Sequence, residues 1–305
     1  TLQPLLTGLR TVRVLRGELS GMALDEAAKF EIDFRLRQKE GEFQQAALLA
    51  NDVHIEVLAD DGVVVPGQAV KVDVIVANRG AADVTVKQVR FNGFAGNAVC
   101  TMTPFTGGGR GGGDSAPAAS TPVIRKDQAA HCDPTLTIPS DARITEPYWH
   151  RENYGGRYTF DADAPFGRPF RPTPFYVQVT LAMAGGEEVI HGPDVEHRYQ
   201  GDIFSGEKRT RLLVVPSLSV RVSPEIAIVP ADAVRVAPPR TTKAKAAAAA
   251  APTTREIRVS VLNDTPGPME SVVKLELPDG WSATPPQQRV ALERGGQSQT
   301  VRFQV

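Results

Sequence analysis

The sequence has little of several features from which function is commonly inferred. Only two of its 305 residues are cysteine, and aromatic residues make up 6%. Lys and Arg (34) balance Asp and Glu (35), giving a formal net charge of −1, so we expect no nucleic-acid partner. No apolar run approaches the roughly 18 residues of a membrane-spanning helix, so we expect no membrane span. The chain starts at Thr1 with neither an initiator methionine nor a signal-type apolar segment, and we expect it to be part of a longer protein.

Motifs for catalysis are also missing. The sequence has no Gly-x-Ser-x-Gly nucleophile motif and no Gly-Lys-Ser/Thr phosphate loop. Asp161 and Asp163 offer two carboxylates, but the glycine turn and the distal glutamate of a calcium loop are lacking. We therefore assign no catalytic residue in this chain.

One short segment contains residue types that bind metal. His191, Asp194, Glu196 and His197 bring two histidines and two acids into residues 191–197. Histidine and carboxylate are ligands of zinc, so a metal-dependent hydrolase stays open as an alternative. Neighbours along a strand point to opposite faces, however, which favours a hairpin with polar outward positions.

The first 51 residues have helical periodicity. Leucines recur at helical spacing between arginines over residues 1–20, which predicts an amphipathic helix. Over 24–50 an alternating pattern from Phe30 to Leu36 competes with a helical one, and the strong helix formers of Gln44–Ala50 favour the helix. We predict two helices that act as a connector.

From residue 52 onward the period changes to two, which is typical of half-buried strands. We predict a mainly β fold of two tandem immunoglobulin-like or fibronectin-like β-sandwiches, over 52–215 and 216–305, preceded by the helical connector. Runs at 54–58, 70–78 and 84–91 are predicted to form a β-meander. A Gly-rich stretch (105–122) and a poly-Ala stretch (238–254) are expected to be solvated insertions.

The second predicted sandwich resembles the first. In both, a short strand leads to an apolar run ending in proline, and later to a Val-x-Val strand ending at asparagine, Asn78 or Asn263. This pattern indicates a weak internal repeat. Trp281, which follows Leu277-Pro278-Asp279-Gly280, is expected to anchor the core of the second copy.

The two cysteines, Cys100 and Cys132, flank the Gly-rich stretch. A disulfide between them would stabilise the fold by roughly 3–4 kcal/mol in the chain-entropy model. Sequence alone leaves two free thiols equally open.

Aromatic residues gather at 145–175, together with several prolines. Tyr148, Trp149, Tyr154 and Tyr158 are candidate ligand-binding residues, because exposed Trp and Tyr rings stack on sugars or fill pockets of a partner. The other interpretation is that Trp149 covers the core where this tract packs on a sheet.

The C-terminal part carries a family resemblance. A strand ending in asparagine, then Leu-Pro-Asp-Gly-Trp (277–281), Pro285-Pro286 and Leu-Glu-Arg-Gly-Gly (292–296), resembles the NPCBM-associated sandwich of bacterial alpha-galactosidases. Upstream stretches resemble the region that follows the catalytic domain in bacterial PIG-L (LmbE-like) de-N-acetylases. These are Leu-Leu-x-Gly-Leu (5–9), residues 34–43, Pro-Tyr-Trp (147–149), Pro-Phe-Arg-Pro (169–172) and Val-Val-Pro (214–216).

The resemblance implies an accessory region rather than an enzyme. The family's chemistry lies in an N-terminal domain with a zinc-binding His-Pro-Asp-Asp motif, which this sequence lacks, so we expect no cofactor here and zinc only in a missing catalytic domain. The implied partner is that upstream domain, with glycan contact as an alternative. The implied location is periplasmic or extracellular.

Overall fold

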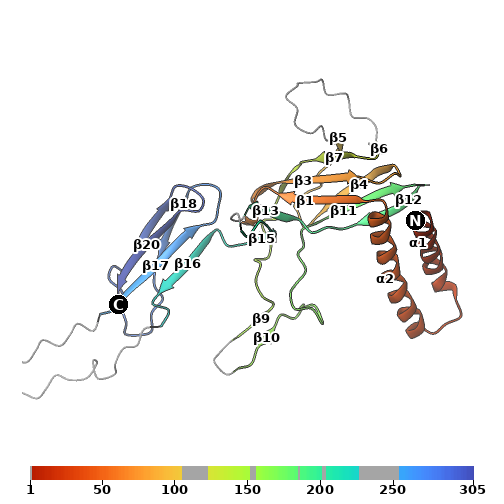
Figure 1. Ribbon diagram of the computed structural model, residues 1–305. Coiled ribbons are helices and arrows are strands. Elements are labelled where there is room, and N and C mark those ends of the chain that lie inside the picture. The colour runs from red at the N-terminus through yellow and green to blue at the C-terminus, as the bar shows by residue number, and fades with distance from the viewer. Residues whose placement is uncertain (1, 105–122, 152–155, 185, 201–203, 227–253) are drawn as a thin grey trace, which may run out of the picture. The chain divides into compact units, whose positions relative to one another are not determined.

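A computed structural model describes residues 2–104, 123–151, 156–184, 186–200, 204–226 and 254–305. The Gly-rich stretch, Tyr154 and the poly-Ala stretch up to residue 253 lie outside these ranges. The chain divides into two compact units, Thr1–Val214 and Val215–Val305. The fold is mainly β with two N-terminal helices (Figure 1), as predicted.

Two antiparallel helices open the first unit. They are α1 (Leu2–Glu18), extended by a 3-10 turn (Leu19–Gly21), and α2 (Glu26–Ala50). Asp25 caps the start of α2, because its side chain accepts a hydrogen bond from the Ala28 N–H at 2.7 Å. Within the described ranges, neither helix is long and apolar enough to cross a membrane.

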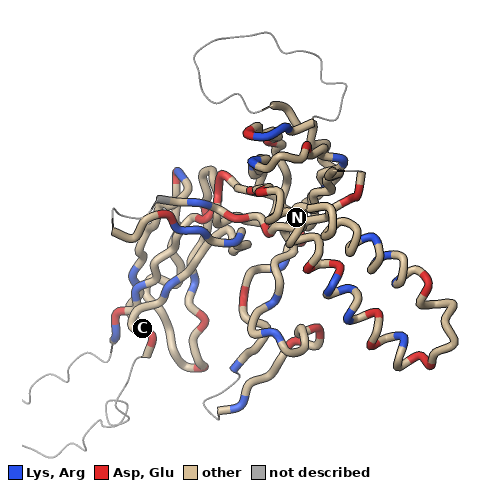
Figure 2. Tube along the Cα trace, turned by 45° about the vertical axis from the view of Figure 1, so that its right-hand side comes forward, with Lys and Arg blue, Asp and Glu red and all other residues tan. Residues whose placement is uncertain are grey.

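Apolar and polar contacts both fix the helices to the β-structure. Leu6 and Leu9 of α1 and Leu48 of α2 are buried in the same core as the strands. Arg13 donates to Glu40 across the helix pair at 2.8 Å and to Glu187 of a strand at 2.9 Å. Figure 2 shows residues of both charge signs along the helix pair. The helices therefore belong to the first unit.

Two main sheets form the body of the first unit. One has the order β14-β13-β1-β3-β7-β5, with β8 also paired to β3, and the other the order β12-β11-β4-β6. Short pairs β15-β2 and β10-β9 complete it. The strands of the first unit are β1 (Val53–Ala59), β2 (Val63–Val64), β3 (Ala69–Asn78), β4 (Val84–Asn92), β5 (Thr103–Pro104), β6 (Val123–Ile124), β7 (Gln128–Cys132), β8 (Thr135–Thr137), β9 (Trp149–His150), β10 (Thr159–Phe160), β11 (Tyr176–Met183), β12 (Glu187–His191), β13 (Glu196–Gln200), β14 (Glu207–Arg211) and β15 (Leu213–Val214).

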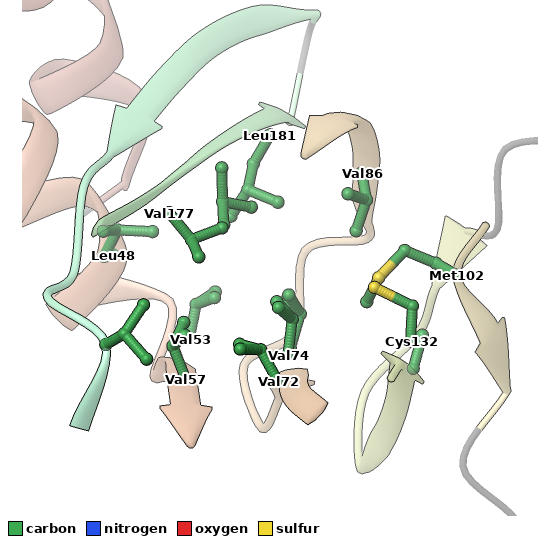
Figure 3. Packing of buried hydrophobic residues seen from close by; sticks show 14 of the residues in the cluster. Leu48, Val53, Val57, Val72, Val74, Val86, Met102, Cys132, Val177 and Leu181 are labelled. Carbon is green, nitrogen blue, oxygen red and sulfur yellow. The ribbon is translucent and has the colours of Figure 1, made fainter. Parts of the chain in front are cut away.

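Alternation along the strands builds the core between these two sheets. On β3, Val72 and Val74 are fully buried, while Lys71 before them is exposed and Asp73 between them is half-buried. They face Val177 and Leu181 of β11, which are equally buried (Figure 3). Valine suits this position because its branched side chain fills a pleated surface.

The predicted meander is wrong at its third strand. β1 and β3 do pair, in a register that opposes Val53 to Asn78. β4 lies in the other sheet, where it pairs with β11 and β6. Alternation identifies a strand and its inward face, but it does not identify the pairing partner, and the chain changes sheets between Asn78 and Val84.

A disulfide joins Cys100 to Cys132 of β7, with their Cα atoms 5.7 Å apart. Cys132 is opposite Val74 in the β3–β7 ladder, so the bridge ties the segment at residue 100 to the large sheet. Met102 is buried beside it (Figure 3).

The second unit is a smaller pair of sheets, with orders β16-β17-β20 and β18-β19. Its core consists of Val259, Val261, Val290, Leu292, Val301 and Phe303. The strands are β16 (Leu218–Ser223), β17 (Glu256–Asn263), β18 (Met269–Val273), β19 (Gln288–Leu292) and β20 (Ser298–Gln304). β16-β17-β20 repeats the order of β1-β3-β7, and β16 opposes Leu218 to Asn263 as β1 opposes Val53 to Asn78. The strand pairing of the two units thus follows the predicted internal repeat, while the apolar run that ends at Pro230 lies outside the described residues.

Trp281 does not anchor this core. Its side chain is 47% exposed, and its backbone N–H closes a turn onto Pro278 O at 3.1 Å. Gly280 before it has φ +84, a conformation that glycine adopts without strain. The turn places the ring at the edge of the unit, and Phe303 fills the interior instead.

Candidate functional site: an aromatic arm and the pocket at its base

The aromatic tract leaves the sheets of the first unit as an extended arm, here defined as residues 143–151 and 156–174 (Figure 1). At its far end β9 and β10 pair as a short antiparallel ladder, which opposes Trp149 to Phe160 and His150 to Thr159. At its base, the backbone N–H of Thr145 donates to Val214 O of β15 at 2.8 Å, and Oγ1 of Thr145 accepts the N–H of Val214 at 2.9 Å. The arm is thus anchored to the sheets at its outgoing end.

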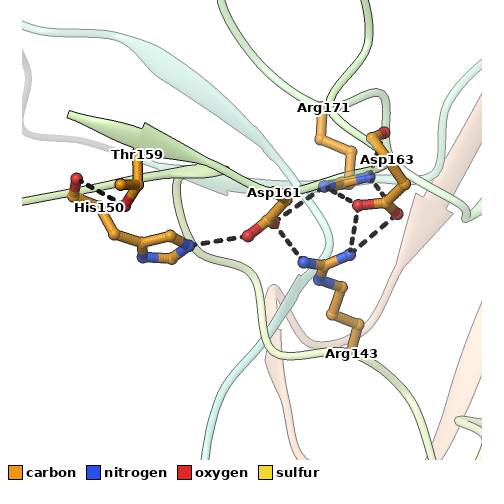
Figure 4. A network of polar contacts seen from close by, with 6 residues as sticks. All are labelled: Arg143, His150, Thr159, Asp161, Asp163 and Arg171. Carbon is orange, nitrogen blue, oxygen red and sulfur yellow. Dashed lines mark hydrogen bonds and ion pairs between the residues drawn. The ribbon is translucent and has the colours of Figure 1, made fainter.

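Four charged side chains tie the two sides of the arm together (Figure 4). Arg171 bridges both acids, with its Nη1 2.9 Å from Asp163 Oδ2 and its Nη2 3.1 Å from Asp161 Oδ2. Arg143 does the same from the other side, at 3.2 Å to Asp163 and in a shorter contact to Asp161. We call these four residues the arm network. Two guanidinium groups that share two carboxylates position the backbone more firmly than an isolated surface pair.

His150 extends the arm network toward the far end, because its Nε2 lies 2.8 Å from Asp161 Oδ1. This hydrogen bond, reinforced by Arg143 and Arg171, holds the pKa of Asp161 below its ordinary value. The hydrogen bond from Arg171 lowers the pKa of Asp163 in the same way. Both carboxylates are therefore charged at neutral pH, and they serve to hold the arm in place.

Most aromatic side chains of the arm face solvent. The exposed rings are Trp149 (41%), Tyr158 (49%), Phe160 (64%), Phe166 (104%) and Phe170 (71%). Trp149 and Tyr158 meet edge to face, with their ring centroids 5.3 Å apart. An edge-to-face pair stiffens two rings without burying them. Trp149, Tyr158 and Phe160 lie together at the paired strands β9 and β10, which makes this end of the arm a candidate interaction surface.

Tyr148 differs from its neighbours. It is only 8% exposed, and its hydroxyl donates to the carbonyl of Arg168 on the returning side of the arm. Of the predicted ligand-binding residues, Tyr148 thus has a mainly structural role, because it joins the two sides of the arm. Trp149 and Tyr158 present their rings to solvent. Tyr154 lies outside the described residues.

A pocket of about 540 Å³ opens where the arm meets the sheets. Its walls come from the two sides of the arm and from the junction of β14 and β15. The lining includes Arg143, Thr145, Glu146, Tyr148, Asp163, Phe170, Arg171, Pro172, Thr173, Pro174, Arg211 and Leu213. The size lies within the roughly 300–1,000 Å³ of small-molecule sites.

The histidine segment does not assemble as a metal site. Nδ1 of His197 lies 3.0 Å from Ala59 O, and Asp194 pairs with Arg211 at 2.9 Å. His191 is on β12, where burial lowers the pKa of its imidazole. Within the described ranges, no group of three or more His, Cys, Asp or Glu side chains could hold a metal ion.

Sequence reasoning found the arm but missed much of its chemistry. The arm network and the exposed phenylalanines were not predicted, because arginine and aspartate are common on any surface. One signal was available: Asp161 and Asp163 lie between Arg143 and Arg171 in the sequence, a spacing that suits a segment folding back on itself.

No family model matches the sequence, and no curated protein does. Among solved structures, the chain is similar to the sporulation control protein Spo0M from Bacillus subtilis at 10% identity, covering 83% of this chain and 90% of that one, with a TM-score of 0.24. It is also similar to the secreted serine protease VesC from Vibrio cholerae at 11% identity, covering 84% and 47% of the two chains, with a TM-score of 0.22. Similarities this weak carry no argument about fold or function.

Proposed function

We propose that this chain is a non-catalytic accessory region of a PIG-L-type N-acetylsugar deacetylase, and that its arm docks on the catalytic domain. The sequence resemblance suggests the family. The single observation that carries the docking role is the arm, which holds its aromatic rings exposed while the arm network fixes its backbone.

The amino-acid chemistry of the arm suits a protein partner. Interfaces concentrate their binding energy in a few tryptophan, tyrosine and arginine side chains. The far end presents Trp149 and Tyr158 as a preformed pair, with the exposed Phe160 on the neighbouring strand. Preorganised rings lose little conformational entropy on binding, which favours affinity.

We place the chemistry and the zinc of the parent protein in the catalytic domain. The proposal also places the protein in the periplasm or outside the cell. The disulfide between Cys100 and Cys132 supports this location, because such bonds persist in oxidising compartments and are rare in the cytosol.

The proposal is tested by binding this chain to the deacetylase domain of the same polypeptide, with calorimetry as the readout. Wild-type chain should bind, and Trp149→Ala should weaken binding by about tenfold or more. Trp281→Ala is the matched control, because Trp281 is equally exposed but lies in the second unit. No binding by the wild-type chain, or equal effects of both substitutions, would refute the docking role.

A second candidate function is glycan binding by the tract around Tyr148 and Trp149. The specific observation in its favour is the exposed Trp149–Tyr158 pair, since flat aromatic faces stack on sugar rings. It would make the chain a carbohydrate-binding module, and titration with oligosaccharides tests it.

A further inference from the structure

We propose that the pocket at the base of the arm binds one uncharged pyranose ring of a saccharide. This inference rests on the second candidate function and moves its site, from the exposed Trp149–Tyr158 pair to the pocket beneath it. Three properties of the pocket carry the proposal: its charge balance, its hydrogen-bonding groups and its apolar wall.

The arginines of the pocket are already neutralised. Arg143 and Arg171 are held by the two carboxylates of the arm network, and Nε of Arg211 is 2.9 Å from Asp194. An anionic ligand would have to displace one of these carboxylates, and it would also face the carboxylate of Glu146 in the same pocket. An uncharged ligand leaves every pair intact, so the pocket favours one.

The remaining polar groups suit hydroxyl groups. Oγ1 of Thr145 accepts a backbone N–H of β15 at 2.9 Å, and Oγ1 of Thr173 accepts the N–H two residues later at 3.2 Å. Each threonine hydroxyl keeps its own hydrogen to donate. The carboxylate of Glu146 accepts, and it has no hydrogen bond or ion pair to any residue that the structure describes. A pocket that offers both donors and acceptors suits the hydroxyl groups of a sugar, because each hydroxyl can donate one hydrogen bond and accept others.

Another part of the pocket lining is apolar. Phe170 lines the pocket with its ring 71% exposed, and Pro172, Pro174 and Leu213 continue the surface. A pyranose ring has one face of C–H groups and an edge of hydroxyls. Its C–H face can rest on Phe170 while the hydroxyls reach the threonines and Glu146, a division typical of small-molecule sites.

The experiment titrates the intact chain with cellotriose, mannotriose and chitotriose as uncharged probes, and with trigalacturonate as the charged probe, by calorimetry and by amide NMR shifts. At least one uncharged trisaccharide should bind and shift the amide of Phe170, and trigalacturonate should bind more weakly. Phe170→Ala should weaken binding by about tenfold, since it removes the stacking ring. Phe166→Ala is the matched control, because this ring is fully exposed and does not line the pocket.

Each other outcome has a distinct meaning. Binding that survives Phe170→Ala but is lost in Trp149→Ala overturns the pocket and leaves glycan binding by the arm intact. Tighter binding of trigalacturonate overturns the uncharged ligand class. If no saccharide binds, both the proposed sugar pocket and the second candidate function are wrong. The docking role is tested independently, by binding of the chain to the catalytic domain.

Discussion

Asn78 and Asn263 hold the same position in the two units and make the same three hydrogen bonds. Both are fully buried. Each amide donates to the carbonyl four residues ahead, at 2.9 Å for Asn78 and 2.7 Å for Asn263, and each side-chain oxygen accepts the N–H two residues ahead, at 3.1 and 2.9 Å. Each amide also reaches a distant carbonyl, that of Ile124 or Arg294, at 2.9 and 3.2 Å. The shared bonds define one corner, where the chain leaves a sheet.

The first prediction concerns this corner. Asn263→Ala should destabilise the second unit by about 2–4 kcal/mol, because it leaves buried backbone groups without partners. Amide hydrogen exchange should show the loss of protection within β17 and β20, with the first unit unchanged. Asn78→Ala should give the reverse pattern. Asn97→Ala, at an exposed position, is the control, and equal effects of all three would contradict the shared role.

In the first unit the corner also receives the end of α2. The side-chain amide of Asn51 donates to Asn78 Oδ1 at 3.1 Å. The backbone carbonyl oxygen of Asn51 lies 2.0 Å from the position that a Cβ on Gly80 would take. A Gly80→Ala change therefore meets backbone that cannot move aside. We expect it to lower the thermal midpoint by several degrees, whereas Gly67→Ala, with open space around its Cβ but positive φ, should cost only about 1 kcal/mol. Similar midpoints for both variants would show that the contact is unimportant.

The disulfide gives a third prediction about stability. Cys100→Ser combined with Cys132→Ser should lower the free energy of unfolding by about 3–4 kcal/mol, because the bridge closes a separation of 32 residues. Urea unfolding of this variant and of wild-type protein in reductant should agree. Thiol titration of the unreduced, unfolded wild-type protein should find no free thiol. Two free thiols would contradict the bridge.

The two aromatic residues of the second unit, Trp281 and Phe303, should differ sharply in how much their removal lowers the free energy of unfolding. Trp281→Ala should change the free energy of unfolding by less than about 1 kcal/mol, because its ring is half exposed at a turn. Phe303→Ala should lower the free energy of unfolding by about 3–5 kcal/mol, because it leaves a cavity in the core. Denaturant unfolding of both variants measures the difference, and a larger loss for Trp281→Ala would restore its role as a core anchor.

The arm network predicts a dependence on pH. A carboxylate whose folded pKa is lowered stabilises the folded arm fully above its unfolded value, near 3.8, and this contribution is lost as the pH falls through the lower folded value. Carboxyl NMR titration should therefore place Asp161 and Asp163 below 3.8. Arg171→Gln should raise both midpoints, and Arg168→Gln on the same segment should not. Ordinary midpoints in the wild-type protein would mean that the network does not persist in solution.

Local pattern was enough for much of the fold. The 3.6 and 2.0 periods located both helices, and the strands β1, β3 and β4 begin and end within one residue of the predicted runs. Val-x-Val ending at Asn78 and Asn263 identified the repeat. These features depend on neighbours in sequence, so sequence alone could reveal them.

Features that depend on distant residues were missed. The partner of β4 is β11, and the pairing partner of a strand is not encoded in its alternation. Trp281 looked like a core residue, but its environment is set by a turn. The arm network joins residues 143, 161, 163 and 171 only after the arm folds back. The candidate site was therefore found as a segment, and its geometry required the structure.

The most direct test of the docking role compares amide hydrogen exchange in the arm between this chain alone and the full-length polypeptide that contains it. If the arm docks on the catalytic domain, amides of Trp149, His150, Thr159 and Phe160 should exchange at least about tenfold more slowly in the full-length protein, and Trp149→Ala should remove most of that difference. Equal exchange at these amides in the two proteins would contradict the account.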